Sequence, residues 1–303
     1  MTSDSSPRNN QKAFTLVEIL VVIAVIGLLS SIIFAITSGT GEQGKITKGL
    51  YFSQHLHNSL GSYAAGIWSF DEGTGTAAND ISGWGNNGTL VNAPTWRCAT
   101  TDPSYTPSGQ GCSLEFNGST NYVNMGDVLD IGVNDLTIET WIKPLTISPA
   151  GNQYVVSKSD SSTTDGRYAV GMSTDGKARV VFDFGPGLAF NGSISLATSW
   201  NHITAVYDRD DDLSIYVNGV YDAGEPISAG NGINYNTSIS FIIGGYTSTS
   251  GFFDGLIDGA RIYNTTLTSA QIESQYYAGL DRLLAKDKIT EQEYQERLAI
   301  NKY

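Results

Sequence analysis

The most constraining feature of this chain is an apolar run over residues 14–36, where Glu18 is the single charged residue among 23. At a rise of 1.5 Å per residue, a helix over this run is about 34 Å long, enough to cross the hydrocarbon core of a bilayer, about 30 Å. The polar segment before it carries Arg8 and Lys12. Because positive charge stays on the cytoplasmic side, the sequence predicts an N-terminal transmembrane α-helix that sends the rest of the chain outward.

A secretory signal peptide and a plain membrane anchor are the simpler interpretations of this segment. The run is longer than the hydrophobic region of an ordinary signal peptide, and no Ala-x-Ala cleavage site follows it. Glu18 lies near the membrane-entering end, where an unpaired carboxylate is costly. This charge therefore indicates a partner for Glu18.

Residues 12–18, Lys-Ala-Phe-Thr-Leu-Val-Glu, followed by the apolar run, resemble the class III signal of type IV prepilins and pseudopilins. The resemblance implies that a prepilin peptidase cuts between Ala13 and Phe14, removes residues 1–13 and methylates the new amine. It also implies that Glu18 pairs in the membrane with the ammonium of Phe14 on a neighbouring subunit. The family usually has Gly in place of Ala13, so slower processing is expected. The expected partners are the peptidase, the membrane and other pilin-like subunits.

The acidity of the chain lies in its middle. Residues 61–279 hold 8 Lys or Arg and 22 Asp or Glu, a net charge of −14, against −13 for the whole chain. Nucleic-acid binding depends on cationic contacts with phosphates, so this part is not expected to bind nucleic acid. Such a surface suits divalent cations instead.

Two cysteines, Cys98 and Cys112, are separated by 13 residues rich in Thr, Ser, Pro and Gly. Neither has a spacing typical of a metal or redox site, and disulfides persist outside the cytosol. The sequence therefore predicts a Cys98–Cys112 disulfide, with two free thiols as the alternative.

From Ile67 onward, short runs of alternating apolar and polar residues are bounded by Gly, Asn, Asp and Ser, which is typical of β-strands. Ten strands without interleaved helices predict a mainly β fold, an antiparallel jelly-roll β-sandwich over residues 61–279 that follows a pilin-type helix and linker over 14–60. The predicted strands are 67–70, 113–116, 136–143, 153–158, 168–172, 178–183, 202–207, 213–217, 239–243 and 256–263.

Six motifs follow one another in this region: WSFDEG at 68–73, DISGWGNNGTL at 80–90, LEFNG at 114–118, TIETWIKP at 137–144, WNHITAVY at 200–207 and GLIDGARIY at 255–263. In this order and spacing they resemble the laminin G-like, concanavalin A-like superfamily over about residues 66–278. The resemblance implies a lectin-like sandwich.

The resemblance makes Glu139 a candidate catalytic acid, because proteins of this fold include glucanases. Such enzymes need a second carboxylate on the same strand face, and residues 140–143 supply none. Trp141, Trp200 and His202 alternate with apolar neighbours and are expected to pack in the sheet rather than bind a ligand. We therefore expect no catalytic residue, and a glycanase remains an alternative.

Calcium is the expected cofactor, held by Asp71 and Glu72 near the first strand and by Asp258 in the last, because first and last strands of such sandwiches commonly adjoin. The alternative is that Asp71 and Glu72 start a turn and Asp258 is solvated. Four loop aromatic residues are candidate sugar contacts, each with packing on the rim as its alternative: Trp84, Tyr105, Tyr235 and Tyr246.

The last 24 residues, 280–303, are predicted to form a short C-terminal helical hairpin. Capping boxes at Thr268/Gln271 and Thr290/Glu293 predict the starts of two helices. The segment resembles a short C-terminal domain found in many bacterial proteins, which implies docking or oligomerisation; a solvated hairpin is the alternative.

Together these features predict a non-enzymatic subunit anchored in the cytoplasmic membrane, or assembled into a pilus or pseudopilus, that displays an adhesive lectin-like module at the cell surface. One alternative is a structural or protein-interaction subunit of a pilus or secretion system. The other is a membrane-tethered glycanase.

Overall fold

The computed structural model describes residues 60–159, 165–184, 187–232, 234, 236–285, 290–292 and 294. The chain divides into two compact units, residues 1–48 and 49–303, and all described residues belong to the second. The residues expected in processing and assembly, Ala13, Phe14 and Glu18, lie outside the described part, as does Tyr235. None of the helices within the described ranges has the length and apolar character needed to cross a membrane.

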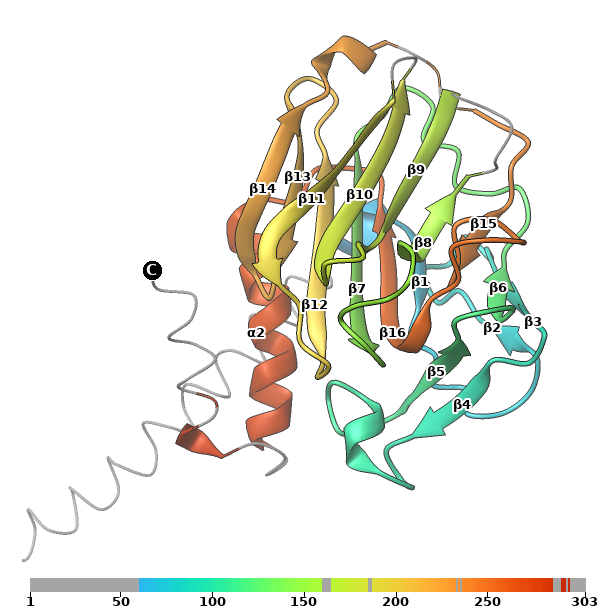
Figure 1. The fold of residues 1–303 in the computed structure, drawn as a ribbon, viewed down its shortest axis with the longest axis vertical. Helices are drawn as coiled ribbons and strands as arrows, with labels where there is room; N and C mark the ends of the chain where they lie inside the picture. Colours follow the sequence, from blue (N-terminus) through green and yellow to red (C-terminus); the bar gives the residue numbers. More distant parts are fainter. Residues whose placement is uncertain are drawn as a thin grey trace, which may run out of the picture. The chain divides into compact units, whose positions relative to one another are not determined.

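The described chain forms two antiparallel sheets that pack face to face (Figure 1). Sheet A has the spatial order β14 (Val220–Pro226), β13 (Asp212–Val217), β12 (Asn201–Tyr207), β7 (Leu136–Pro144), β16 (Asp254–Tyr263), β5 (Cys112–Asn117) and β4 (Thr95–Cys98), and β1 (Ala64–Trp68) also pairs with β16. Sheet B has the order β11 (Leu188–Ser195), β10 (Lys177–Phe184), β9 (Asp165–Met172), β8 (Gln153–Lys158), β15 (Phe241–Ile243), β6 (Tyr122–Asn124), β3 (Gly88–Val91) and β2 (Ala77–Ala78). This arrangement confirms the predicted mainly β sandwich.

All ten predicted strands are present, with ends that differ by up to three residues from those predicted. Six further strands, β2, β3, β4, β6, β11 and β14, were not predicted. Short 3-10 helices cover Gly61–Tyr63, Pro103–Tyr105 and Ser228–Gly230.

The core lies between the two sheets and is built from the alternate, inward-facing residues of each strand. Trp68 of β1 stacks on Phe241 of β15 with ring centroids 5.6 Å apart, and both side chains are fully buried. Tyr207 of β12 reaches across to sheet B, where its hydroxyl donates to the carbonyl of Ala169 at 3.1 Å. The two sheets are therefore joined by aromatic packing and by a buried hydrogen bond.

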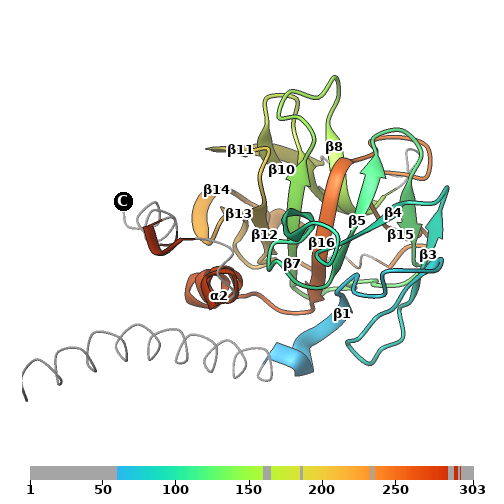
Figure 2. The same cartoon turned by 90° about the horizontal axis from the view of Figure 1, so that it is seen from below.

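The outer face of sheet A is covered by α2 (Ser269–Ala285), which Figure 2 shows beside β12 and β13. Tyr276 and Leu280 of α2 pack on Trp141 of β7, which confirms that Trp141 has a packing role. The predicted capping box opens the helix: the amide of Gln271 donates to Thr268 Oγ1 at 3.3 Å, and the amide of Thr268 donates to Gln271 Oε1 at 2.8 Å. Because α2 continues to Ala285, it crosses the boundary drawn at residues 279 and 280.

The predicted disulfide is confirmed, and it joins two adjacent strands of sheet A. Cys98 of β4 lies opposite Cys112 of β5, and their sulfur atoms are bonded. Gly73 packs against both sulfurs, and with a φ of 67° it takes a backbone conformation that a larger residue would adopt only with strain.

Reduction of this disulfide is expected to lower the free energy of unfolding by about 3 kcal/mol, because the cross-link restricts the unfolded chain over a loop of about 15 residues. Denaturant unfolding of the full-length chain in detergent, with and without dithiothreitol, measures this loss. A Cys98→Ala/Cys112→Ala variant is the control, since the reductant should not affect it. Equal unfolding midpoints for the oxidised and reduced wild type would contradict the prediction.

Candidate functional site

Trp84 stands at a cavity of about 320 Å³ at one end of the sandwich, here called the Trp84 pocket. Its side chain is 70% exposed, yet its Nε1 donates a hydrogen bond of 2.9 Å to the carbonyl of Ala64. The ring is therefore oriented by a backbone contact while its surface stays open to solvent. The pocket is lined by Ala65, Trp84, Asn86, Val128, Leu129, Asp130, Ile131, Asn134, Leu136, Ile262 and Asn264.

The loop that carries Trp84 is fastened to β1 by Asp80. The Asp80 carboxylate accepts hydrogen bonds from the amides of Ile67 (2.9 Å), Ser82 (2.8 Å) and Asn86 (2.9 Å). Burial opposes ionisation of Asp80, but these hydrogen bonds, with the Ser82 side chain, outweigh it and lower its pKa. The loop is thus folded around an ionised carboxylate, which fixes the position of Trp84.

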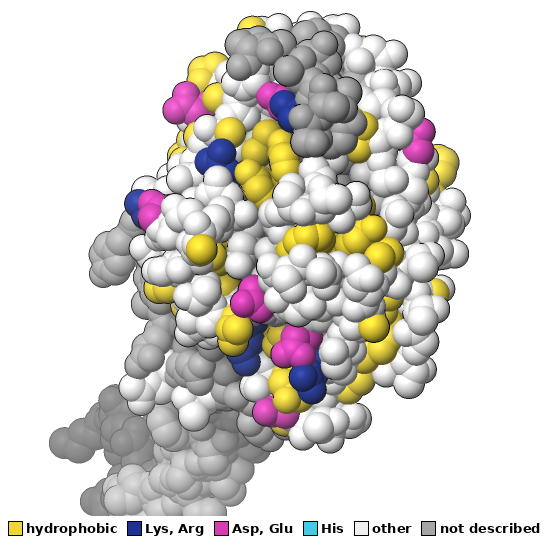
Figure 3. Space-filling model, turned by 45° about the vertical axis from the view of Figure 1, so that its right-hand side comes forward, with side chains coloured by type: hydrophobic (Ala, Val, Ile, Leu, Met, Phe, Trp, Pro, Cys, Tyr) yellow, Lys and Arg dark blue, Asp and Glu magenta, His cyan; other side chains and the backbone are white. Residues whose placement is uncertain are grey.

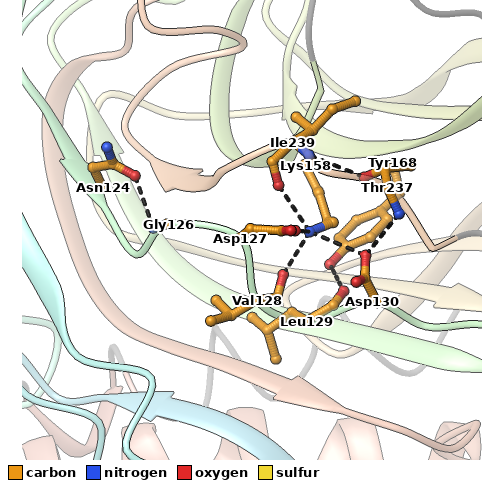
Figure 4. A network of polar contacts seen from close by, with 10 residues as sticks. All are labelled: Asn124, Gly126, Asp127, Val128, Leu129, Asp130, Lys158, Tyr168, Thr237 and Ile239. Carbon is orange, nitrogen blue, oxygen red and sulfur yellow. Dashed lines mark hydrogen bonds and ion pairs between the residues drawn. The ribbon is translucent and has the colours of Figure 1, made fainter.

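The opposite wall of the Trp84 pocket is a loop, residues 126–131, folded around a buried ammonium group (Figure 4). Lys158 of β8 is fully buried, and its Nζ lies 3.0 Å from Asp127 Oδ1 and 3.1 Å from Asp130 Oδ1. It also donates to the carbonyls of Val128 and Ile239, each at 2.8 Å. Because a buried charge needs such partners, this network holds the loop in one conformation.

Two further contacts fix the same loop. Leu129 has a φ of 60°, uncommon for a residue with a side chain, and its carbonyl accepts a 2.7 Å hydrogen bond from the buried hydroxyl of Tyr168. Asp130 also accepts from the amide of Thr237 at 3.1 Å. Sequence reasoning missed Lys158, which ends β8 after the apolar residues Tyr154, Val155 and Val156.

The chemistry of the Trp84 pocket suits an uncharged polar ligand. It combines an exposed aromatic face with the side-chain amides of Asn134 and Asn264, which have no hydrogen-bond partner among the described residues. On the face that Figure 3 shows, charged side chains stand in small separate groups among uncharged and hydrophobic ones. A pocket with an apolar platform and a few convergent polar groups is the usual form of a small-molecule site.

Tyr105 and Tyr246, the other predicted sugar contacts among the described residues, do not join Trp84. Tyr105 lies under the guanidinium of Arg97, 5.4 Å from the ring centroid, and Tyr246 packs on Tyr154 with centroids 4.4 Å apart. Neither residue lines the Trp84 pocket. Both rings instead pack against neighbouring side chains, as the alternative interpretation held.

The predicted calcium ligands are only partly brought together. Asp71 and Asp258 line one cavity of about 290 Å³, here called the acidic pocket, whereas Glu72 turns away and accepts from the amide of Asn79 at 2.6 Å. Asp71 and Glu72 lie in a turn after β1, as the alternative interpretation held, and the turn does not bring Glu72 to the same cavity as Asp71. Within the described ranges, no group of three His, Cys, Asp or Glu residues is arranged to hold a metal ion, so the three-carboxylate ligand set was wrong.

A β-bulge in β16 aims two charged residues at the outer face of sheet A. Asp258 lies opposite Trp141, and Arg261 lies opposite Glu139. The chain therefore advances by three residues along β16 while it advances by two along β7. Gly259 provides the bulge with a φ of 58°. Without it, Asp258 and Arg261 would lie on opposite faces, because side chains alternate along a strand.

Glu139 is buried under α2 and serves as an ion-pair partner. It is 1% exposed, and its Oε1 lies 3.0 Å from both Arg261 Nη1 and His202 Nε2. Burial opposes the ionisation of Glu139, but Arg261 and His202 together lower its pKa. Glu139 lines neither the Trp84 pocket nor the acidic pocket, so its position gives no support to a catalytic role.

The ionised form of the Asp258 carboxyl is electrostatically unfavourable. It is 9% exposed, and burial together with repulsion from Asp71 raises its pKa well above the ordinary value for Asp. A carboxyl with a raised folded-state pKa favours the folded state at low pH and opposes folding once the pH rises above the unfolded-state value, about 3.9.

Asp258→Asn is therefore expected to raise the melting temperature at pH 7, by roughly 2–4 °C for each kcal/mol relieved in a domain of this size. The gain should shrink towards zero below about pH 4, where the wild-type carboxyl is protonated in both states. Glu273→Gln on α2 makes the same change of charge away from the pocket and should leave the melting temperature unchanged. A lower melting temperature for Asp258→Asn at pH 7 would contradict the prediction.

Two sequence families match this chain. Residues 117–273 match the concanavalin A-like lectin/glucanases superfamily, and residues 8–34 match the prokaryotic N-terminal methylation motif. A comparison with curated proteins finds no significant match. Both matches agree with the resemblances in the sequence, and the second shows a pilin-like N-terminal motif.

Solved structures share the fold at low identity. The binding domain of Paraclostridial Mosquitocidal Protein 1 is 16% identical with a TM-score of 0.56, over 73% of this chain and 53% of that one. The botulinum neurotoxin serotype D binding domain is 15% identical with a TM-score of 0.54, over 74% and 53%. Domain 4 of an extracellular GH43 arabinanase from Geobacillus stearothermophilus, solved with arabinotriose, is 19% identical with a TM-score of 0.51, over 70% and 98%.

The chain thus spans about half the length of the two toxin domains and nearly all of the arabinanase domain. At these identities the likeness shows the fold alone. The family match covers residues 117–273, more than half of the chain, and the two-sheet architecture agrees with it. This protein belongs to the concanavalin A-like lectin/glucanases superfamily.

Proposed function

We propose that this protein is a type IV pilin-like surface subunit whose β-sandwich binds carbohydrate at the Trp84 pocket without cleaving it. The observation that carries the proposal is Trp84 itself, which is held 70% exposed by its bond to Ala64 beside the unpaired amides of Asn134 and Asn264. An aromatic face packs on the C–H face of a sugar ring, and amides exchange hydrogen bonds with its hydroxyls.

The rigidity of the pocket supports the same proposal. Both of its walls are fixed, one by Asp80 and the other by Lys158, so little conformational freedom is lost when a ligand binds. Among the proteins of similar fold, the arabinanase domain was solved with arabinotriose and the toxin domains are named as binding domains. The N-terminal methylation motif supports display of the sandwich at the cell surface, on a membrane anchor or in a pilus.

The two alternatives make different demands on the molecule. A glycanase needs an accessible pair of carboxylates, and Glu139, the strand carboxylate considered for it, is buried and paired with Arg261 and His202. A purely structural subunit needs no ligand pocket, so this alternative does not account for the exposed position of Trp84.

Replacement of Trp84 by Ala is expected to abolish glycan retention, because the loss of one stacking platform removes most of the apolar contact in a shallow sugar site. The full-length chain in detergent is applied to a glycan array and to arabino-oligosaccharides, and reducing ends are assayed in the same samples. Tyr221→Ala, which removes another exposed aromatic ring, on β14, should bind as the wild type does.

Retention that survives in Trp84→Ala would place the sugar site elsewhere. Absence of retention of the wild type across the whole array would favour the structural subunit, and release of reducing sugar would show a glycanase.

Maturation is expected to remove residues 1–13, because the N-terminal methylation motif spans residues 8–34 and the chain has Ala13-Phe14 at the family's cleavage position. N-terminal sequencing and mass measurement of the membrane form should find N-methylated Phe14. An Ala13→Gly variant is the matched comparison and should mature faster. A membrane form that keeps Met1, or that starts beyond Ser38, would contradict this maturation.

A further inference from the structure

The acidic pocket brings two carboxylates from distant parts of the chain to one cavity. Asp71 follows β1, where its Oδ1 accepts from the amide of Cys112 at 3.0 Å, and Asp258 comes from the bulge of β16. Asp258 is nine-tenths buried, and its carboxyl accepts a hydrogen bond from the backbone amide of Gly259. Within the described part of the chain, neither Asp71 nor Asp258 forms an ion pair.

The one cationic residue in the wall of this pocket is already engaged. Arg261 Nη1 lies 3.0 Å from Glu139 Oε1 and 3.3 Å from Gln275 Oε1, under α2. Its guanidinium also attracts Asp258, but burial and repulsion from Asp71 outweigh this attraction and keep the pKa of Asp258 raised. A buried carboxylate facing a second carboxylate is unfavourable unless a cation comes between them.

The remaining walls argue for an organic cation rather than a metal ion. Ile67, Ile81, Pro107 and Trp141 give the pocket apolar sides, and its volume of about 290 Å³ is far larger than one ion needs. Calcium takes six to eight oxygen ligands at roughly 2.3–2.6 Å. Ser69, Ser108 and Gln110 also line the pocket, but within the described ranges no third Asp, Glu, His or Cys side chain joins the two carboxylates. A cation at the end of an aliphatic stem fits both parts of the pocket, because the stem contacts the apolar walls and the charge meets the carboxylates.

We propose that the acidic pocket binds the side chain of a lysine or arginine presented by a partner protein. The ammonium or guanidinium group lies between Asp71 and Asp258, and the stem runs along Ile67 and Ile81. Trp141, whose ring stacks on Tyr276, adds to the apolar wall. The net charge of −14 over residues 61–279 favours the approach of a basic partner surface. This inference does not rest on the proposed sugar site.

The same arrangement predicts a pH dependence for the interaction. The charged groups that face the bound cation are Asp71 from the segment after β1, Asp258 from β16, and Arg261, which is held by Glu139 of β7. A cation binds the ionised form of Asp258, whose pKa is raised, so binding releases a proton and strengthens as the pH rises.

The test uses the full-length chain in detergent and saturation-transfer NMR, which detects weak binding through the ligand's own methylene protons. The probes are Nα-acetyl-lysine methylamide and Nα-acetyl-arginine methylamide. The uncharged Nε-acetyl form of the lysine probe, n-butylammonium and calcium chloride are the comparisons. We expect saturation of the stem protons of both charged probes, and none for the Nε-acetyl form.

Asp258→Asn should weaken binding of the charged probes at least tenfold, because it removes the buried half of the carboxylate pair. Asp254→Asn is the matched control: it changes another partly buried aspartate of β16 that does not line the pocket, and it should bind as the wild type does. The melting temperature of each variant confirms that it is folded.

Three results would overturn the proposal: no saturation of either charged probe, equal binding by Asp258→Asn, or a calcium-dependent rise in melting temperature that Asp258→Asn removes. n-Butylammonium has the stem and the ammonium of lysine, so it should bind as the lysine probe does. The calcium result would show a metal site. Loss of glycan retention in Trp84→Ala has no bearing on these outcomes.

Discussion

The pairing of β16 with strands from the first half of the sandwich is the interaction on which the rest of the structure depends. β16 lies between β7 and β5 and also pairs with β1, so residues near 260 are bonded to residues near 65, 115 and 140. Contacts of such long sequence separation form only when the chain is already compact. Both pockets, the Glu139 ion pair and the packing of α2 follow from this one strand position.

Each pocket lies at an irregular part of the sandwich, one at loops and the other at a β-bulge. The Trp84 pocket is made by loops at one end of the sheets, and each loop is folded around a buried or half-buried charge, Asp80 or Lys158. The acidic pocket lies on the outer face of sheet A, where the bulge at Gly259 brings Asp258 and Arg261 to the same face. The regular parts of the sheets supply rigidity, and the irregular parts supply the chemistry.

Strands were predictable where their residues alternate between core and solvent or are buried on both faces. β7, β8 and β12 are of this kind, and their predicted and observed ranges nearly coincide. β2 is two residues long, and β11 and β14 are edge strands whose residues are mostly half-buried or exposed. Such strands are specified by pairing with a neighbour rather than by their own pattern, which is why the sequence did not reveal them.

The sequence by itself determined the pilin-like N-terminus, the sandwich class, the disulfide and the capping box of α2, because each of these depends on residues close together in the chain. It also identified Trp84, Asp71 and Asp258, but not the side chains that lie beside them. Only the tertiary structure decided that Glu72 points away, that Tyr105 and Tyr246 pack elsewhere, and that Lys158 fixes a pocket wall. Side-chain alternation is a local rule, whereas the neighbours of a strand, and a bulge that reverses its faces, are set by long-range pairing.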